Sequence, residues 1–597
     1  MSSAPRLLLV EDERHVADLL ARRSGERQDR WIALGPSAMN ALERQGLRYA
    51  IPEDYHRWSE LAELCAELHR RVQRLCSELD RALLERAPEL AERSIAPFQF
   101  HIFPLIMMFD SLAARTLQLR RVLAAHPGAT PAIHVRPPQA PTDPELLFSS
   151  QETLWGRVLA LITGGREADL LADPGPARRA SARNLARRLV GSSVTLTTLA
   201  MSLRQGGVPR ALLGRGESVL LVQGGPEWAA ALAAIRRTGL RPLFALEARF
   251  APPLRLAGRD EALDSLIASQ LGSLFVVEGV SLYPLLAERL AAIWRQSATA
   301  AAMIARRIGA VRRRHRVRAV LRGSVSAGTG HMLNQLARGS GLPVLTWQHG
   351  MVTNRGEISQ FRQFTDMMTA NLVLAFGEES ARAYERGRAR GPQVSVARVG
   401  SATLDAIGER PRACRPPSGT VRVVYATTNY YRNDWYLGFA PGLSDRWLYR
   451  DQRTIAAALT EWSAAGRCEV RIKLHPDGDP PWAQGVRESR SLQVARARPT
   501  FAELLAWCDA VLLDFPSTTL LQALAAGRPT FVLLRFWRPS PDAQALLGRA
   551  AVARETAAEL CEELRAYLQT RSFPADPDDS AFLRMCGTHA DGGGAAA

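Results

Sequence analysis

Two motifs in the last third of the sequence carry side chains that could hold an anion. The first reads IKLHP, over residues 472–476, and ends an apolar stretch typical of a strand. Lys473 in this motif is the only lysine of the chain. An ammonium is a compact point charge that a guanidinium does not reproduce. Lys473 and His475 are two residues apart and would project from the same face of the strand end, so the motif predicts a contact to an anionic group.

The second motif reads DFPSTTLLQALAAGRPT, over residues 514–530. A predicted strand at 510–513 leads into a turn, and a helix then starts with Ser517, Thr518 and Thr519. The free N–H groups of a helix start carry partial positive charge and bind phosphate, and hydroxyl groups add donors. The motif therefore predicts a phosphate site, although ordinary helix capping by Ser517 is the alternative interpretation.

His349 is the candidate general base. It lies in VLTWQHGMV, over residues 344–352, where an apolar strand ends in polar residues and a glycine. An imidazole near its ordinary pKa can accept a proton at neutral pH. Gln348 beside it is a candidate substrate contact. The alternative interpretation of His349 is a residue that only forms hydrogen bonds at an interface between lobes.

The fourth candidate is the loop RGSVSAGTGH, over residues 322–331. Its glycine and serine content allows close approach of the backbone to a ligand, and Ser324 and Ser326 are candidate substrate contacts. The loop lacks the lysine that follows the last glycine of a P-loop, which argues against an ATP site.

The elements that must position these residues alternate between strands and helices, a pattern that indicates an α/β fold with mostly parallel, doubly wound sheets. Ligands bind such sheets at the carboxyl ends of the strands, which is where all four motifs fall. The predicted strands of the two main series lie at 218–222, 242–246, 274–277, 317–321, 344–347, 372–375 and 394–399, then at 421–426, 469–474, 492–494, 510–513 and 530–534.

The pattern predicts two Rossmann-like lobes. Residues 1–410 would form an N-terminal lobe, opened by strands at 6–10 and 31–34 and interrupted by a helical insertion at about 56–205. The segment RPRACRPPSG, at 410–419, reads as a linker because it is rich in proline and turn-forming residues. A C-terminal lobe at 420–572 and a tail at 573–597 complete the prediction.

Composition restricts the class of protein. The chain has 597 residues and a net charge of +17, and its densest basic run is at 312–318. The seven cysteines form no CxxC pair and no His/Cys cluster at metal-ligand spacing, so no structural zinc is expected. The apolar stretch at 98–109 is interrupted by His101 and closed by Asp110, which argues against a membrane span. We expect a cytoplasmic protein with a candidate peripheral contact to the anionic inner face of the membrane.

The motifs WQHG, FGEES, VGSATLD, IKLHP and DFPSTTLLQALAAGRPTFVL together resemble those of GT-B glycosyltransferases. More narrowly, they resemble bacterial surface-carbohydrate enzymes: the capsule-type transferases that use CMP-activated acidic sugars, and the CDP-glycerol glycerophosphotransferases of teichoic acid synthesis. The resemblance covers residues 317–570 well and residues 1–55 loosely, and it does not explain the helical region.

This resemblance implies an enzyme that moves a sugar or glycerol-phosphate unit from a CMP-, CDP- or UDP-linked donor to a surface polysaccharide or lipid-linked acceptor. It implies that Lys473, His475, Ser517 and Thr518 contact the donor, with Thr519 in the same turn, and that His349 activates the acceptor. It also implies that residues 1–410 form the acceptor lobe and residues 420–572 the nucleotide-donor lobe. No DxD pair appears where a metal-dependent GT-A enzyme would hold its cation, so transfer would be metal-independent, with no cofactor and no nucleic-acid partner.

Three points stay open at this stage. A carboxylate base is not assigned, and Glu357, Asp366 and Glu378 are all candidates. A UDP-sugar 2-epimerase shares the two-lobed plan but needs further carboxylates around the sugar. A non-catalytic protein of a polysaccharide-assembly complex is the other alternative.

Overall fold

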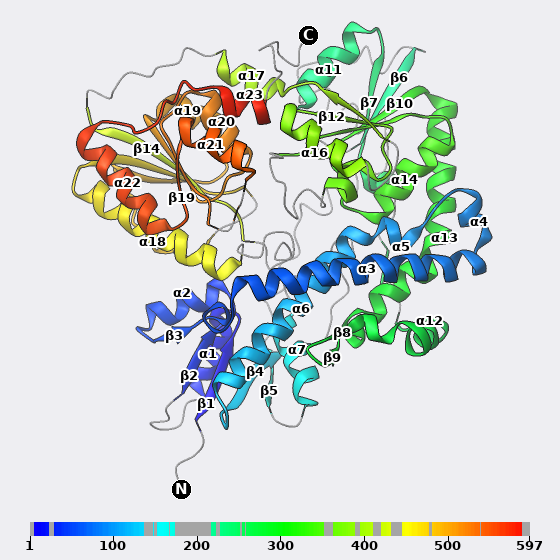
Figure 1. Ribbon diagram of the computed structural model, residues 1–597, viewed down its shortest axis with the longest axis horizontal. Coiled ribbons are helices and arrows are strands. Elements are labelled where there is room, and N and C mark those ends of the chain that lie inside the picture. Colours follow the sequence, from blue (N-terminus) through cyan, green and yellow to red (C-terminus); the bar gives the residue numbers. More distant parts are fainter. Residues whose placement is uncertain are drawn as a thin grey trace.

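The computed structural model describes most of the chain. It covers residues 5–22, 29–136, 147–148, 152–165, 168–173, 216–222, 227–250, 254–256, 258–350, 362–388, 394–409, 419–430, 444–476, 480–535, 537 and 539–587. Within these ranges, three parallel sheets have five, six and six strands, and two short strands form a separate pair. The predicted α/β class with parallel sheets in two lobes is confirmed: two sheets lie in the N-terminal lobe and one in the C-terminal lobe (Figure 1).

Sheet A begins the N-terminal lobe and has the strand order β3-β2-β1-β4-β5. Helix α1 starts at Asp12, whose carboxylate accepts hydrogen bonds from the backbone N–H groups of Arg14 and His15. The elements are β1 (Arg6–Val10), α1 (Glu13–Ala21), β2 (Arg30–Ala33), α2 (Pro36–Arg44), β3 (Tyr49–Ala50), β4 (Thr130–Val135) and β5 (Asp169–Ala172).

The segment at 56–205 contains the expected helices and also strands β4 and β5, which were not predicted. Both strands belong to sheet A. Strand β4 lies between the two predicted helical stretches, at 56–125 and 150–205, and β5 lies within the second. Residues 174–215 lie outside the described ranges. The helical elements are η1 (Pro52–Tyr55), α3 (Trp58–Arg86), α4 (Pro88–Glu92), α5 (Pro97–Phe100), α6 (Ile102–Ala125) and α7 (Leu154–Thr163).

Helix α6 is the one described helix that is long and apolar enough to cross a membrane, and its apolar stretch is entirely buried inside the protein. Its polar groups have protein partners: His69 Nε2 of α3 lies 2.9 Å from Asp110 Oδ2, and Arg115 Nη1 donates to the Ser111 carbonyl at 2.9 Å. Such burial and pairing are what a core helix shows.

Sheet B completes the N-terminal lobe with the order β13-β12-β11-β10-β6-β7. The chain runs from β6 outward to β7 and returns on the other side of β6 as β10, so the strand order reverses between β6 and β10. The strands are β6 (Glu217–Val222), β7 (Arg241–Ala245), β10 (Arg316–Arg322), β11 (Val344–Trp347), β12 (Leu372–Ala375) and β13 (Ser395–Arg398). Its helices include α11 (Trp228–Arg237), α12 (Glu261–Leu266), α13 (Tyr283–Arg314), α14 (Gly328–Gly339), α16 (Glu378–Arg388) and α17 (Ala402–Gly408).

The strand predicted at 274–277 is not part of sheet B. Only β8 (Val276–Val277) forms there, and it pairs antiparallel with β9 (Val280–Ser281). Its apolar run is mostly a 3-10 turn, Gly272–Phe275, in which Phe275 is fully buried. A short apolar run does not by itself separate a strand from a buried turn.

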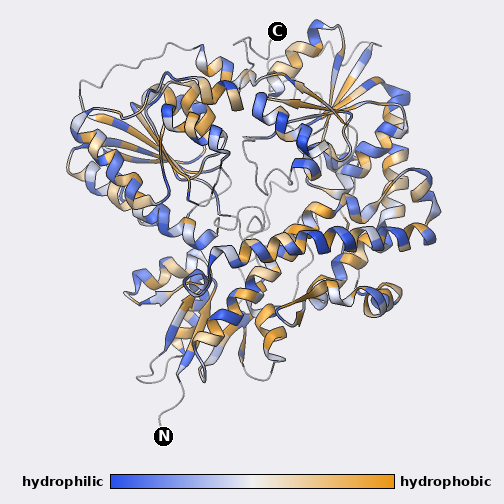
Figure 2. Ribbon diagram, in the orientation of Figure 1, coloured by the Kyte–Doolittle hydropathy of each residue, from blue (hydrophilic) through white to orange (hydrophobic). Residues whose placement is uncertain are grey.

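Sheet D forms the C-terminal lobe with the order β16-β15-β14-β17-β18-β19, which reverses between β14 and β17. Strands β17 and β18 are buried along their whole length, as parallel strands covered by helices on both faces should be; Figure 2 shows these strands as hydrophobic. The strands are β14 (Val421–Ala426), β15 (Cys468–Lys473), β16 (Leu492–Ala495), β17 (Ala510–Leu513), β18 (Thr530–Leu533) and β19 (Val552–Arg554). The helices are α18 (Asp445–Ala464), α19 (Phe501–Trp507), α20 (Thr518–Ala525), α21 (Pro541–Ala550) and α22 (Ala557–Thr570).

A buried arginine joins the C-terminal lobe to the sheet A region. Arg446 of α18 is 1% exposed, and its Nε lies 2.9 Å from both carboxylate oxygens of Glu53 in η1. Its Nη1 donates to the Leu34 carbonyl at 2.9 Å, and its guanidinium lies 5.1 Å from the centre of the Trp155 ring. The two regions are therefore held together by an ion pair removed from water.

The last described helix, α23 (Ala581–Cys586), lies in the segment predicted as a tail. Phe582, Leu583 and Cys586 are buried in the core formed with α20 and α21. A Cβ at Gly377 of the N-terminal lobe would lie 2.5 Å from the Met585 carbonyl oxygen, so α23 also lies directly against that lobe. The prediction gave 573–597 only as a tail and assigned no helix to it, because this helix has six residues and follows an Asp- and Pro-rich stretch.

Candidate functional site

The turn after β11 lies against the start of α20, so the two lobes meet at two of the predicted motifs. Gly350 has φ +70°, and a Cβ built on it would lie 3.1 Å from Thr518 Oγ1. A side chain at this position would therefore be both strained and crowded. His349 and the Ser517–Thr519 turn, which are separated by more than 150 residues in the sequence, thus belong to one place in the fold.

The backbone around His349 is held by Gln348. The buried Gln348 amide donates to the Gly350 carbonyl at 2.8 Å and to Ser380 Oγ at 3.1 Å, and its Oε1 accepts from the Phe376 N–H at 2.9 Å. These bonds tie the end of β11 to the end of β12 and the start of α16. The Gln348 side chain thus positions the turn, and its carbonyl and amide groups already have protein partners.

His349 is exposed at this turn. The surrounding protein removes part of the solvent from its ring and so lowers the pKa of the imidazole, and the Arg362 guanidinium lowers it further, while Asp366 acts in the opposite direction. A ring with a lowered pKa is neutral at pH 7 and can accept a proton.

The three candidate carboxylates differ in position. Asp366 is buried, and its Oδ2 accepts a hydrogen bond from Tyr384 Oη at 2.5 Å. Its negative charge acts to raise the pKa of His349, against the lowering by burial and by Arg362. Glu378 faces the surface and pairs with Arg382 and Arg398, and Glu357 lies outside the described residues.

The start of α20 has the form of a helix N-terminus with hydroxyl groups. Ser517 is the N-cap, and its Oγ accepts from the Thr519 N–H at 3.4 Å and lies 2.9 Å from Thr519 Oγ1. All three hydroxyl residues are half-buried. This turn follows β17, beside the point where the strand order of sheet D reverses, which is where parallel sheets bind ligands.

Asp514, at the end of β17, anchors that reversal point and was not singled out from the sequence. Its carboxylate accepts hydrogen bonds from the Thr428 N–H at 2.8 Å, Gln452 Nε2 at 2.7 Å and Tyr425 Oη at 3.1 Å. These bonds join the ends of β14 and β17 to helix α18. Burial raises the pKa of Asp514 to about 7 despite the three donors.

This pKa predicts a pH dependence of stability. An aspartate whose pKa in the folded protein is raised above its ordinary value stabilises the fold at low pH, and that contribution is lost as pH rises toward 7. Relative to Asp514→Asn, the parent protein should lose unfolding free energy between pH 4 and 7, with a slope of up to about 1.4 kcal/mol per pH unit. Urea unfolding across this range measures the difference, and parallel curves for the two proteins would contradict it.

The structure does not bring Lys473 to the Ser517 turn. Lys473 is 7% exposed, and its ammonium donates to the Arg496 carbonyl, which follows β16. Strand β14 separates β15 from β17, which puts the two strand ends roughly 10 Å apart, and Arg496 lies on the far side. His475 is nearer to the reversal point, since its N–H donates to Thr427 Oγ1 at 3.2 Å, just after β14.

The loop at 322–331 lies at the reversal point of sheet B, after β10. Ser326 is exposed, and Ser324 is half-buried with an Oγ that has no hydrogen-bond partner among the described residues. Arg322 below them is buried, and its Nη2 lies 2.7 Å from Glu247 Oε2. Both serines therefore lie at the edge of sheet B where a ligand of the N-terminal lobe would be expected. The buried ion pair between Arg322 and Glu247 holds the start of their loop in place.

Sequence reasoning missed Asp514, Gly350 and the Gln348 bonds. Gly350 carried a signal, because a glycine directly after a polar strand end indicates a constrained turn. In the described part of the chain, no group of three or more His, Cys, Asp or Glu side chains could hold a metal ion.

The chain matches no protein-family model, and it matches no curated protein. Solved structures to which it is similar include MurG of Acinetobacter baumannii, at 14% identity and a TM-score of 0.32 over 62% of this chain and 94% of MurG. CalG4, the calicheamicin glycosyltransferase, is 12% identical with a TM-score of 0.37, over 64% of this chain and 96% of CalG4. The spinosyn rhamnosyltransferase SpnG, solved with thymidine diphosphate, is 15% identical with a TM-score of 0.34, over 62% of this chain and 95% of SpnG.

Proposed function

We propose that the protein is a GT-B-type transferase that moves a sugar or glycerol-phosphate unit from a nucleotide-activated donor to a surface polysaccharide or lipid-linked acceptor. The observation that carries the proposal is the contact between Gly350 and Thr518. It supports a single site in which the turn that carries His349 in one lobe lies beside a helix start of the other lobe.

In this proposal the donor phosphate binds at the start of α20. Its free N–H groups, its partial positive charge and the hydroxyls of Ser517, Thr518 and Thr519 all favour a phosphate. Stabilising the leaving nucleotide phosphate in this way needs no metal ion. His475 is close to the same reversal point, whereas Lys473 would act indirectly, by holding the end of β16 through Arg496.

In the same proposal His349 takes the proton from the acceptor hydroxyl. That oxygen attacks the anomeric carbon of a sugar donor, or the phosphorus that carries the glycerol of a glycerol-phosphate donor, and the nucleotide phosphate leaves. Its lowered pKa keeps the ring neutral and ready to accept a proton. Ser324 and Ser326 would contact the acceptor from the neighbouring reversal point.

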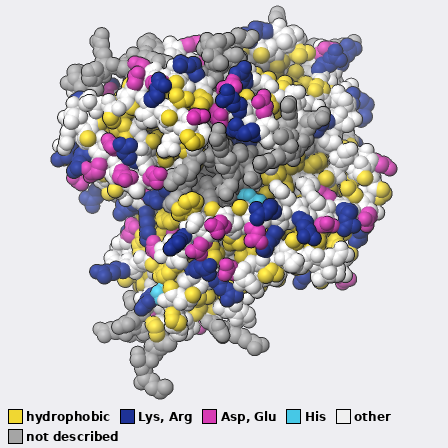
Figure 3. Space-filling model, viewed as in Figure 1, with side chains coloured by type: hydrophobic (Ala, Val, Ile, Leu, Met, Phe, Trp, Pro, Cys, Tyr) yellow, Lys and Arg dark blue, Asp and Glu magenta, His cyan; other side chains and the backbone are white. Residues whose placement is uncertain are grey.

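The candidate membrane contact is also a proposal. Arg312, Arg313, Arg314, Arg316 and Arg318 are all exposed where α13 ends and β10 begins, and such a run is attracted to anionic headgroups. On the face seen in Figure 3, basic and acidic side chains are intermixed.

Replacing Ser517 by glycine tests the donor site. Glycine is a tolerated N-cap, so the helix loses only a few tenths of a kcal/mol, while the donor loses a hydroxyl contact to phosphate. We expect nucleotide affinity to fall by roughly 1.5 kcal/mol, or about 10-fold. Calorimetric titration with CMP, CDP, UDP and GDP measures the nucleotide affinity and shows which nucleotide the site prefers.

Thr556→Gly is the matched control, because Thr556 caps α22 in the same lobe and its side chain accepts from the Glu559 N–H. Its nucleotide affinity should equal that of the parent protein. If Ser517→Gly and the parent protein bound nucleotide with equal affinity, the donor site would not be at the start of α20. Binding of polysaccharide without hydrolysis or transfer from any nucleotide sugar would favour the non-catalytic alternative.

A further inference from the structure

A basic cavity lies in the C-terminal lobe at the edge where the strands of sheet D begin. It has a volume of about 420 Å³ and is lined by the start of β14, the turn after α18 and the end of α22. Strand β14 begins at Val421 beside the cavity and ends at Ala426, so the Ser517 turn is roughly 20 Å away at the opposite edge of the sheet. The cavity is thus separate from the proposed donor site.

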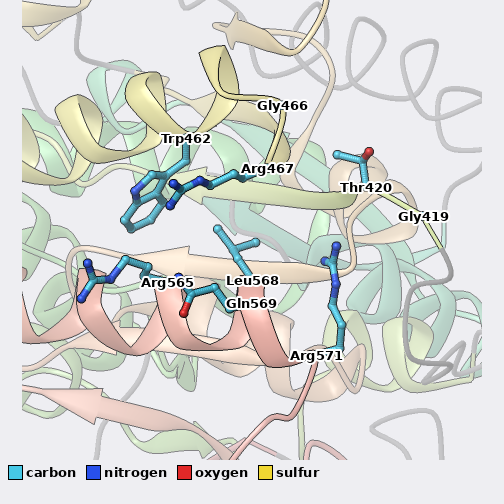
Figure 4. Close-up of a pocket in the computed structure, with 9 residues that line it drawn as sticks. All are labelled: Gly419, Thr420, Trp462, Gly466, Arg467, Arg565, Leu568, Gln569 and Arg571. Atoms are coloured by element: carbon cyan, nitrogen blue, oxygen red, sulfur yellow. The ribbon is translucent and has the colours of Figure 1, made fainter.

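Its lining is rich in arginine. Arg467, Arg565 and Arg571 line it together with the Trp462 indole and Leu568 (Figure 4). No Asp or Glu occurs among the described residues that line the cavity. Arg565 also pairs with Glu562 on the same helix, whereas Arg571 Nη1 is buried without a hydrogen-bond partner among the described atoms.

The positive charge exceeds the negative charge nearby. The carboxyl ends of α18 and α22 each contribute roughly half a negative charge, and Glu562 contributes one. Three guanidinium groups therefore leave a net charge of about +1 facing the cavity.

Arg571 is held in a conformation that costs energy. It ends α22 with φ +60°, in the left-handed region where glycine is the usual residue. Arginine at such a position accepts backbone strain, while its side chain lines the cavity and carries one buried nitrogen without a hydrogen-bond partner among the described atoms. The backbone conformation would favour glycine at this position, so the presence of arginine is explained by its guanidinium group at the cavity.

We propose that this cavity binds a small phosphorylated ligand, of the size of pyrophosphate or a sugar phosphate. Guanidinium groups match the oxygens of phosphate in bidentate geometry. The Trp462 indole and Leu568 supply a flat apolar wall for the organic part of the ligand. The proposal does not depend on the transferase function, since the two sites lie at opposite edges of sheet D.

Calorimetric titration of the full chain with inorganic pyrophosphate, and separately with glucose 6-phosphate, tests the proposal. Sodium chloride at matched ionic strength is the comparison. We expect saturable binding of at least one phosphate compound. Arg571→Gly should weaken it by about 10- to 100-fold, because a charge-assisted contact is lost, while the unliganded protein stays at least as stable because glycine relieves the left-handed strain.

Arg467→Ala is a second variant with the same expected loss of binding, and it removes an exposed side chain. Arg498→Ala is the charge-matched control, since that side chain is 75% exposed at the other edge of the sheet, and it should bind like the parent. Ser517→Gly should also bind like the parent, which separates this cavity from the donor site. Unchanged binding by both Arg571→Gly and Arg467→Ala, or an equal loss in Arg498→Ala, would overturn the proposal.

Discussion

Replacing His349 by alanine is expected to lower turnover by about 100-fold or more while nucleotide affinity stays close to that of the parent. The ring is exposed, so its removal leaves little cavity behind. Gln348 and Gly350 hold the backbone on both sides of it through contacts that do not involve the imidazole. The variant should therefore lose proton transfer and keep the donor site.

Steady-state rates of nucleotide release and a separate nucleotide titration measure the two quantities. Because the pKa of His349 is lowered, the parent rate should fall only on the acid side of neutrality, and this acid limb should disappear in the variant. His126→Ala is a matched control, since His126 contacts Arg30 and Tyr55 in the sheet A region. Near-normal turnover in His349→Ala would remove His349 from the mechanism.

Arg446→Ala is expected to cost about 3 to 5 kcal/mol of unfolding free energy. The substitution removes the partner of Glu53, a carboxylate that is 5% exposed and lies within a protein core. It also leaves the Leu34 carbonyl without its donor and takes a cation from the face of Trp155. The loss should thus come from stranded polar groups more than from the ion pair itself.

Arg450→Ala on the same helix is the matched control. Arg450 pairs with Asp54 at 2.9 Å, but both side chains are over a third exposed, and such surface pairs contribute about 1 kcal/mol or less. Urea unfolding of both variants measures the contrast. Equal losses would mean that the Arg446 ion pair is no stronger than a surface pair.

Much of sheets B and D could be predicted because their strands are apolar runs between turn-forming residues. Strands β11, β12, β14 and β17 have the predicted bounds. Strand β4 was missed because Pro131 and His134 interrupt its apolar character, although both side chains sit in a strand that is buried along most of its length. Strand β5 was missed because its sequence, DLLA, is a short apolar run next to acidic residues, and it is mostly exposed.

The candidate site was predicted in part. His349 and Ser324 follow strands of sheet B, and Ser517 follows a strand of sheet D, so the order of elements places each at the carboxyl edge of its own sheet. The contact between the two sheets at Gly350 and Thr518 does not follow from that order. The sequence shows that Lys473 is the only lysine, but it does not show the direction of the side chain. The ammonium donates to the Arg496 carbonyl, which follows a different strand, β16. Arg446 and Glu53 are almost 400 residues apart, and no local pattern marks such a pair.

The position of α23 has a consequence for biosynthesis. Gly377 and α16 are translated long before Met585, yet the Met585 carbonyl closes the surface at Gly377. During synthesis, the surface at Gly377 therefore stays uncovered until α23 has been made. Any product that ends early, or is clipped before Ala581, would expose the hydrophobic residues that α23 covers in both lobes. Chaperones and proteases recognise such exposed hydrophobic surface. Only chains that include α23 cover it, so the helix distinguishes complete chains from truncated ones.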